Sequence, residues 1–227
     1  EQNRYLVVWR HTVNPGVAEV RAQLLVSSGT PIGSPLTLAS STTLVGAPAV
    51  GYVRATNRFL VTWAIGPSSS LSFGSVQMVS LAAAGGAPSP TVTVASALLT
   101  TFDQPQVGGD SRPAGVANEY ACIVYRRSTA GGHQIESRGV HVTAAANPIL
   151  VGTVQVVASG NVAHLSIAKH AGSAGNWVAA WVDGNSDVGP FLNVWCRVIG
   201  AFGVPCSAAK LLSLGSASAD VLATACA

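Results

Sequence analysis

The stretch Tyr5-Leu-Val-Val-Trp9 decides the fold, because it returns three times along the chain. Its later copies read Phe59-Leu-Val-Thr-Trp63, Ala121-Cys-Ile-Val-Tyr125 and Trp177-Val-Ala-Ala-Trp181, and their final aromatic residues follow one another at intervals of 54, 62 and 56 residues. Counting from Trp181 to the last residue and on from the first residue to Trp9 gives a further 55 positions. The chain therefore contains four copies of one unit, evenly spaced around a cycle.

Each copy predicts a small sheet of four strands. Its anchor strand is apolar on both faces, with Tyr5, Val7 and Trp9 on one side and Leu6 and Val8 on the other. Strands of this kind lie between two layers of structure. Turn-forming pairs at 28–29, 85–86, 131–132 and 184–185 separate the strand-like pieces. A repeat of this length with four strands is the signature of a β-propeller.

We therefore predict an all-β fold, a four-bladed β-propeller in a single domain of residues 1–227. The blades are residues 219–227 with 1–40, then 48–96, 103–159 and 162–216. The first copy lacks an opening strand, and Asp220-Val-Leu-Ala-Thr-Ala-Cys-Ala227 supplies one. Pairing this C-terminal strand with the N-terminal blade closes the ring and removes an exposed sheet edge. A sandwich or β-solenoid of the same strands, or a piece of a larger propeller, are the alternatives.

The amino-acid composition argues against nucleic acid as a partner and against a membrane span. Only 9% of residues are charged, the formal net charge is +3, and 48% are hydrophobic. The basic residues are scattered, which argues against nucleic acid; the one adjacent pair, Arg126-Arg127, is interpreted as a solvated strand end. No apolar run approaches the ~20 residues of a membrane span. The chain opens without a signal peptide, so we interpret it as a mature form or a piece of a longer protein. The oligomeric state is not indicated.

The four cysteines do not form a dense disulfide framework. Cys196 and Cys206 flank a turn-like segment between two strands, where a disulfide is as probable as two thiols. Cys122 lies inside an apolar strand and is predicted to be a buried thiol. Cys226 is either free or paired. No Cys/His cluster has the spacing of a zinc site.

One resemblance follows from these motifs. The segment Asn3-Arg-Tyr-Leu-Val-Val-Trp9, a polar turn, a strand with Gln or Arg, and the ending Leu36-Thr-Leu-Ala-Ser40 resemble propeller-type repeats of secreted bacterial proteins. The resemblance covers all four blades, and its motifs are structural. It implies a secreted or extracellular location (periplasm or cell surface included) and a binding or scaffolding role. The third copy departs from the pattern, with Tyr125 in place of Trp and an insert through residues 110–115.

The candidate site residues are few. Asp110 and Arg112 in that insert, and His164 on an innermost strand, are the candidates for ligand binding. Asp183, Asn185 and Asp187 alternate in a turn and resemble the start of a calcium loop, although no distal Glu follows; calcium is the one cofactor considered.

The anchor aromatics Trp9, Trp63, Tyr125 and Trp181 are interpreted as packing between blades rather than as sugar-stacking residues. We expect a non-catalytic extracellular binding module that takes a carbohydrate, as a lectin does, or a protein. A structural subunit of an extracellular complex is the first alternative. The second is a hydrolase at the channel mouth, with Asp103 and Asp110 as acid and base.

Overall fold

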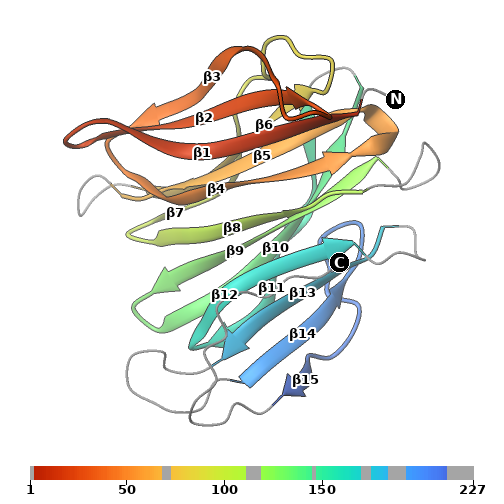
Figure 1. The fold of residues 1–227 in the computed structure, drawn as a ribbon. Helices are drawn as coiled ribbons and strands as arrows, with labels where there is room; N and C mark the ends of the chain where they lie inside the picture. The colour runs from red at the N-terminus through yellow and green to blue at the C-terminus, as the bar shows by residue number, and fades with distance from the viewer. Residues whose placement is uncertain are drawn as a thin grey trace.

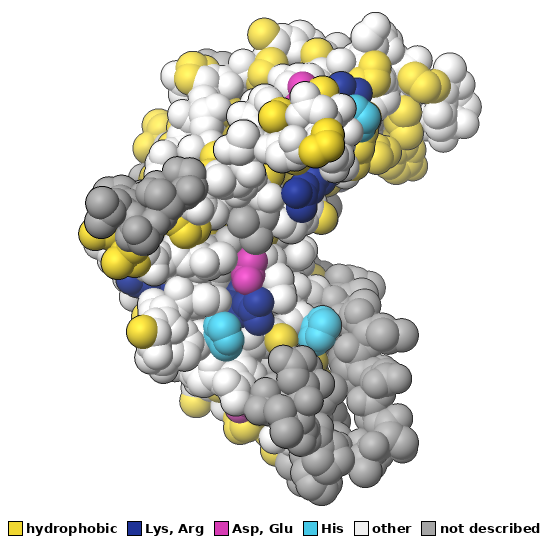
Figure 2. All heavy atoms as spheres, turned by 90° about the vertical axis from the view of Figure 1, so that its left-hand side faces the viewer, with side chains coloured by type: hydrophobic (Ala, Val, Ile, Leu, Met, Phe, Trp, Pro, Cys, Tyr) yellow, Lys and Arg dark blue, Asp and Glu magenta, His cyan; other side chains and the backbone are white. Residues whose placement is uncertain are grey.

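The computed structural model describes residues 3–67, 73–110, 119–144, 147–169, 175–183 and 193–213. These residues form four antiparallel sheets that follow the four sequence copies. The all-β class is thus confirmed, in a propeller-like arrangement. Figure 1 shows the sheets stacked in chain order, and Figure 2 shows that the stack is curved and hollowed on one side.

Within each sheet the strands follow one another in sequence order. Sheet A contains β1 (Arg4–Asn14), β2 (Val17–Val26) and β3 (Pro31–Ser41). Sheet B contains β4 (Leu44–Val53), β5 (Arg58–Ile65), β6 (Phe73–Ala82) and β7 (Val92–Leu98), with a short 3₁₀ turn (Arg54–Thr56) after β4. Sheet C contains β8 (Thr101–Gly108), β9 (Tyr120–Thr129), β10 (Gly132–Val142) and β11 (Pro148–Gly160). Sheet D contains β12 (Val162–Lys169), β13 (Trp177–Asp183), β14 (Asn193–Ile199) and β15 (Lys210–Ser213).

The second strand of each four-stranded sheet is apolar because it is covered on both faces. In β5, Phe59, Val61 and Trp63 pack against sheet A, while Leu60 and Ala64 pack against sheet C. The same alternation continues in β9 and β13. Three hydrophobic cores therefore lie between successive sheets. The anchor aromatics of sheets B, C and D are buried in these cores, as the sequence predicted. The fourth, Trp9 of sheet A, is only partly buried and belongs to none of the three cores.

Sheet A differs from the other three sheets at its inner edge. It has three strands among the described residues, and β1, which occupies the edge, pairs with β2. The missing innermost strand agrees with the sequence, where the first copy lacks one. The strand predicted to fill the place, within residues 219–227, lies outside the described residues.

The cysteine prediction is wrong in one respect: Cys196 and Cys206 are free thiols. Cys196 lies in β14 opposite Ala180 and Lys210. The Cys206 amide instead donates to the carbonyl of Val198 at 2.8 Å, so the hairpin places Cys206 opposite a different residue. The prediction for Cys122 is confirmed, since its thiol is fully buried and burial raises its pKa. Cys226 lies outside the described residues.

The interpretation of Arg126-Arg127 as a solvated strand end is also wrong. Both residues lie within β9, both are partly buried, and each is paired with a carboxylate. No helix among the described residues is long and apolar enough to cross a membrane.

Candidate functional site

A cavity of about 370 Å³ lies between sheets B and C. One wall is residues 93–97 of β7, and the other carries side chains from all four strands of sheet C. The sheet C residues are Phe102 of β8, Arg127 of β9, Glu136 and Arg138 of β10 and Val154 of β11. Its volume is within the range of pockets that hold small ligands, ~300–1,000 Å³.

The register of β9 and β10 explains why three charged side chains gather in this cavity. Glu136 pairs with Tyr125 across the two strands, and Arg138 pairs with Ile123. Arg127 is two residues beyond Tyr125, so period-two alternation puts its side chain on the same face. Arg127 Nη1 donates to Glu136 Oε1 at 3.0 Å. The Glu136 side chain is 4% exposed and that of Arg127 is 33% exposed, so the pair opens toward the cavity through the arginine.

Arg138 ties the two walls together. Its Nη1 donates to the carbonyl of Val94 at 2.5 Å. Val94 is the extra residue of a β-bulge in β7, because Val76 pairs with Ala95 and Gln77 with Thr93. A bulge leaves its extra residue outside the ladder, so the Val94 carbonyl is available to another sheet.

The next junction repeats this contact. Arg197 Nη1 of sheet D donates to the carbonyl of Val157 at 2.7 Å, and Val157 is the extra residue of a bulge in β11. Arg197 pairs with Ala179, which corresponds to Ile123 in the repeat, so Arg138 and Arg197 are equivalent residues. We call this contact the arginine clasp. It occurs in sheets C and D, whereas the equivalent position in sheet B holds Val79, opposite Val61.

Two lining residues of the cavity have a buried donor without a hydrogen-bond partner among the described residues, Arg127 Nε and Arg138 Nε, and the hydroxyl of the neighbouring Tyr125 also lacks a well-formed hydrogen bond. Burial raises the pKa of the Tyr125 hydroxyl, and the nearby Glu136 carboxylate raises it further. Leaving such donors unpaired costs stability, and native proteins carry few of them. The cores on either side each contain one such donor, Trp63 Nε1 and Trp195 Nε1.

Of the candidates for ligand binding that the sequence suggested, the structure describes Asp110 and His164. Asp110 is fully buried and joins two sheets: its amide donates to the Tyr52 carbonyl at 2.8 Å, and its carboxylate lies 3.9 Å from Lys169 Nζ. Asp110 thus contacts neighbouring sheets through both its backbone and its side chain. His164 is exposed on β12. Arg112 lies outside the described residues.

One of the three candidate calcium ligands, Asp183, lies in the described part of the chain. Asp183 ends β13, and Asn185 and Asp187 lie outside the described residues. The described part of the chain contains no cluster of three metal-ligating side chains.

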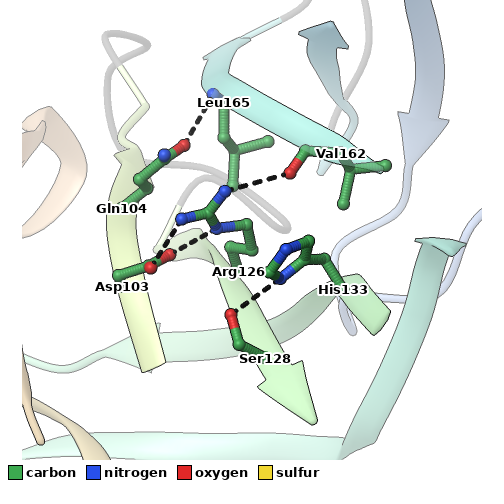
Figure 3. A network of polar contacts seen from close by, with 7 residues as sticks. All are labelled: Asp103, Gln104, Arg126, Ser128, His133, Val162 and Leu165. Carbon is green, nitrogen blue, oxygen red and sulfur yellow. Dashed lines mark hydrogen bonds and ion pairs between the residues drawn. The ribbon is translucent and has the colours of Figure 1, made fainter. Parts of the chain in front are cut away.

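Asp103 and Asp110, considered as an acid and base pair, lie toward opposite ends of β8. Asp103 instead belongs to a polar network between sheets C and D (Figure 3). It receives two hydrogen bonds of 2.7 Å from Arg126, which raise the pKa of that guanidinium. Arg126 also donates to the Val162 carbonyl at 3.3 Å. The network thus fastens sheet D to sheet C.

A second contact in Figure 3 joins Ser128 Oγ and His133 Nδ1 at 2.8 Å. In a catalytic triad the carboxylate binds the histidine. Here Asp103 accepts both of its hydrogen bonds from Arg126, so Ser128, His133 and Asp103 do not form such a triad. Gln104 accepts a hydrogen bond of 3.4 Å from the Leu165 amide and has φ +48°. His164 has φ +49° at the corresponding bulge of β12. Positive φ at both residues reflects a bulge that recurs in the innermost strands.

Sequence reasoning missed Arg127, Glu136 and Arg138. The sequence analysis assigns no role to Glu136 or Arg138, and it interprets Arg127 as part of a solvated strand end. A usable signal was present, because charged residues alternate at 136 and 138 in the same copy that replaces the anchor Trp by Tyr125. That they share one face with Tyr125 depends on the strand register.

Comparison with known proteins adds no assignment: no family model matches the chain, and no curated protein matches it.

Proposed function

We propose that this protein is a non-catalytic binding module and that the cavity between sheets B and C holds a carbohydrate. The observation that carries the proposal is the set of charged side chains at that cavity, Arg127, Glu136 and Arg138, two of which have a buried unpaired donor. Sites for small ligands combine an apolar wall with a few convergent polar groups. Phe102 and Val154 supply apolar surface, and the charged side chains supply donors and acceptors for hydroxyl groups.

Glycan binding tests this proposal directly. The purified protein is applied to a glycan array, and any bound glycan is titrated against wild type and Glu136→Ala. We expect wild type to retain at least one glycan and the variant to lose affinity about tenfold, since a carboxylate that accepts a hydroxyl contributes roughly 1.5 kcal/mol. An array on which wild type retains nothing would falsify the proposal.

The extracellular location remains part of the proposal and is supported by the resemblance to repeats of secreted bacterial proteins. The described cysteines give it no support, since Cys122, Cys196 and Cys206 are free.

Ring closure is also part of the proposal. The open inner edge of sheet A supports a closed four-bladed propeller in which Asp220–Ala227 pairs with β1. Hydrogen exchange tests the pairing. Those β1 amides that do not bond to β2 are protected if a strand adds to that edge, and they exchange at the rate of open peptides if none does.

One observation favours a second function, that of an assembly subunit. On the outer face of β1, Tyr5 is 59% and Val7 is 46% exposed. Their equivalents in sheet B, Phe59 and Val61, are buried against the preceding sheet. Apolar residues at the same place in the repeat are thus left open in sheet A, as at a protein interface. Light scattering tests this function: an assembly subunit is oligomeric, and Val7→Glu makes it monomeric. A monomer at high concentration contradicts it.

A further inference from the structure

We infer that the sugar bound between sheets B and C carries a carboxylate, as a uronic acid does. This inference rests on the proposed function and adds the chemical class of the ligand. It departs from the expectation of a neutral sugar that low overall charge suggests, because the charge of one pocket is set by the side chains that line it.

The side chains that line the cavity carry a net positive charge. Arg127 and Arg138 bring two permanent positive charges to the cavity, and Glu136 brings one negative charge. The cavity therefore has one cation in excess. Guanidinium groups stay charged at every physiological pH, so this excess persists.

The guanidinium groups of Arg127 and Arg138 have N–H donors that no described residue uses. Among the described residues, Arg127 donates only to Glu136 and Arg138 only to the Val94 carbonyl, each through Nη1. A guanidinium has five N–H donors in a fixed fork that matches the two oxygens of a carboxylate. Arg127 is one-third exposed and can present such a fork to a ligand without losing its contact with Glu136.

The other lining residues indicate what the rest of the ligand contains. Glu136 repels a compact, highly charged anion such as phosphate, whereas it accepts hydrogen bonds from hydroxyl groups. Phe102 and Val154 offer apolar surface to the C–H face of a ring. A ligand with one carboxylate, several hydroxyls and an apolar face satisfies all these groups together.

The junction between sheets C and D shows which residues make the difference. It has the same arginine clasp, through Arg197. Trp195 occupies the position of Glu136, because it pairs with Trp181 as Glu136 pairs with Tyr125. Asp183 stands two residues beyond Trp181, in the place of Arg127. The clasp alone therefore does not create the site, and Arg197 provides a matched control.

Calorimetry with two matched sugar pairs, glucuronate with glucose and galacturonate with galactose, tests the inference. We expect the acid of at least one pair to bind wild type about tenfold more tightly than its neutral partner, the effect of one charge-assisted hydrogen bond of roughly 1.4 kcal/mol. Arg127→Gln removes this preference, because it weakens binding of the acid about tenfold more than binding of the neutral sugar. Glu136→Gln strengthens binding of the acid, since it removes the competing carboxylate. Arg197→Gln changes neither.

The outcomes separate the inference from the proposed function. Equal affinity for acid and neutral sugar overturns the inference and leaves the proposed function standing. Binding of no member of either pair overturns the inference, and the glycan array then decides the proposed function separately. If Arg127→Gln does not fold, Arg127→Lys takes its place: it keeps the charge and loses the fork, so it retains part of the preference for the acid. A preference for the acid that Arg127→Gln, or Arg127→Lys in its place, leaves at its full size also overturns the inference.

Discussion

Removing the Tyr125 hydroxyl is expected to stabilise the protein. The side chain is fully buried, and its ring makes an edge contact with Phe102 at 5.7 Å between centroids. Its hydroxyl lies close to the Glu136 carboxylate but makes no well-formed hydrogen bond to it or to any other described group. Tyr125→Phe keeps the ring in place and removes the unpaired group. Since a buried unsatisfied polar group costs roughly 1–3 kcal/mol, we expect Tyr125→Phe to raise the free energy of unfolding by about 1 kcal/mol at pH 7.

The gain should grow at alkaline pH. Burial, and then the Glu136 carboxylate, raise the pKa of Tyr125 above its value of ~10 in the unfolded chain. Above pH ~10 the unfolded chain therefore releases a proton that the folded chain retains, and stability falls by up to about 1.4 kcal/mol per pH unit. Tyr125→Phe abolishes this contribution. The difference between variant and wild type should thus reach roughly 2 kcal/mol at pH 11.

Urea denaturation of wild type and Tyr125→Phe at pH 7, 10 and 11 measures both effects. The other titrating groups contribute equally to both proteins and cancel in the difference. A loss of more than 1 kcal/mol at pH 7 would refute the reasoning, because it would mean that the hydroxyl donates a hydrogen bond, with Glu136 as the nearest acceptor. A difference that does not change with pH would refute the argument from the pKa.

Two further predictions concern close packing and thiol chemistry. Gly74→Ala should destabilise the protein by about 3 kcal/mol or more in urea denaturation, because an added Cβ meets the Thr100 carbonyl oxygen. Gly131→Ala is the control, since the nearest atom lies 3.8 Å from its Cβ, and equal losses in the two variants would contradict the packing argument. Iodoacetamide at pH 8 should alkylate Cys206, which is exposed, and spare Cys122, whose pKa is raised by burial. Peptide mapping reads both thiols, and labelling of native Cys122 would show that its strand opens.

The four sheets were predictable because the repeated anchor strands mark where each sheet lies in the sequence. An anchor strand that is apolar on both faces must lie between layers, and four evenly spaced anchors imply four sheets. The aromatic positions Trp63, Tyr125 and Trp181 were interpreted correctly as packing residues for the same reason. A repeated apolar pattern can be interpreted without knowing which residues face one another across a turn.

The site was not predictable because it depends on pairing between strands. Glu136 lines the cavity because it lies opposite Tyr125, and the Val94 carbonyl reaches Arg138 because β7 contains a bulge. Neither register nor bulge can be inferred from the residues of one strand alone. The incorrect disulfide has the same origin, since the hairpin brings Cys206 opposite Val198 rather than Cys196.

The junction of sheets B and C contains a pocket because the residue opposite its anchor aromatic is smaller than the one at the junction of sheets C and D. Between sheets C and D, the position opposite the anchor aromatic holds Trp195, which is large. Between sheets B and C the same position holds Glu136, which has much less volume and cannot fill that space. The arginine clasp keeps both pairs of sheets together through a backbone carbonyl, so the sheets need not collapse when the filling side chain is lost. The smaller Glu136, together with Arg127 and Arg138, therefore leaves open space with polar walls. Glu136→Trp should then close the cavity and abolish ligand binding while the clasp from Arg138 to Val94 remains.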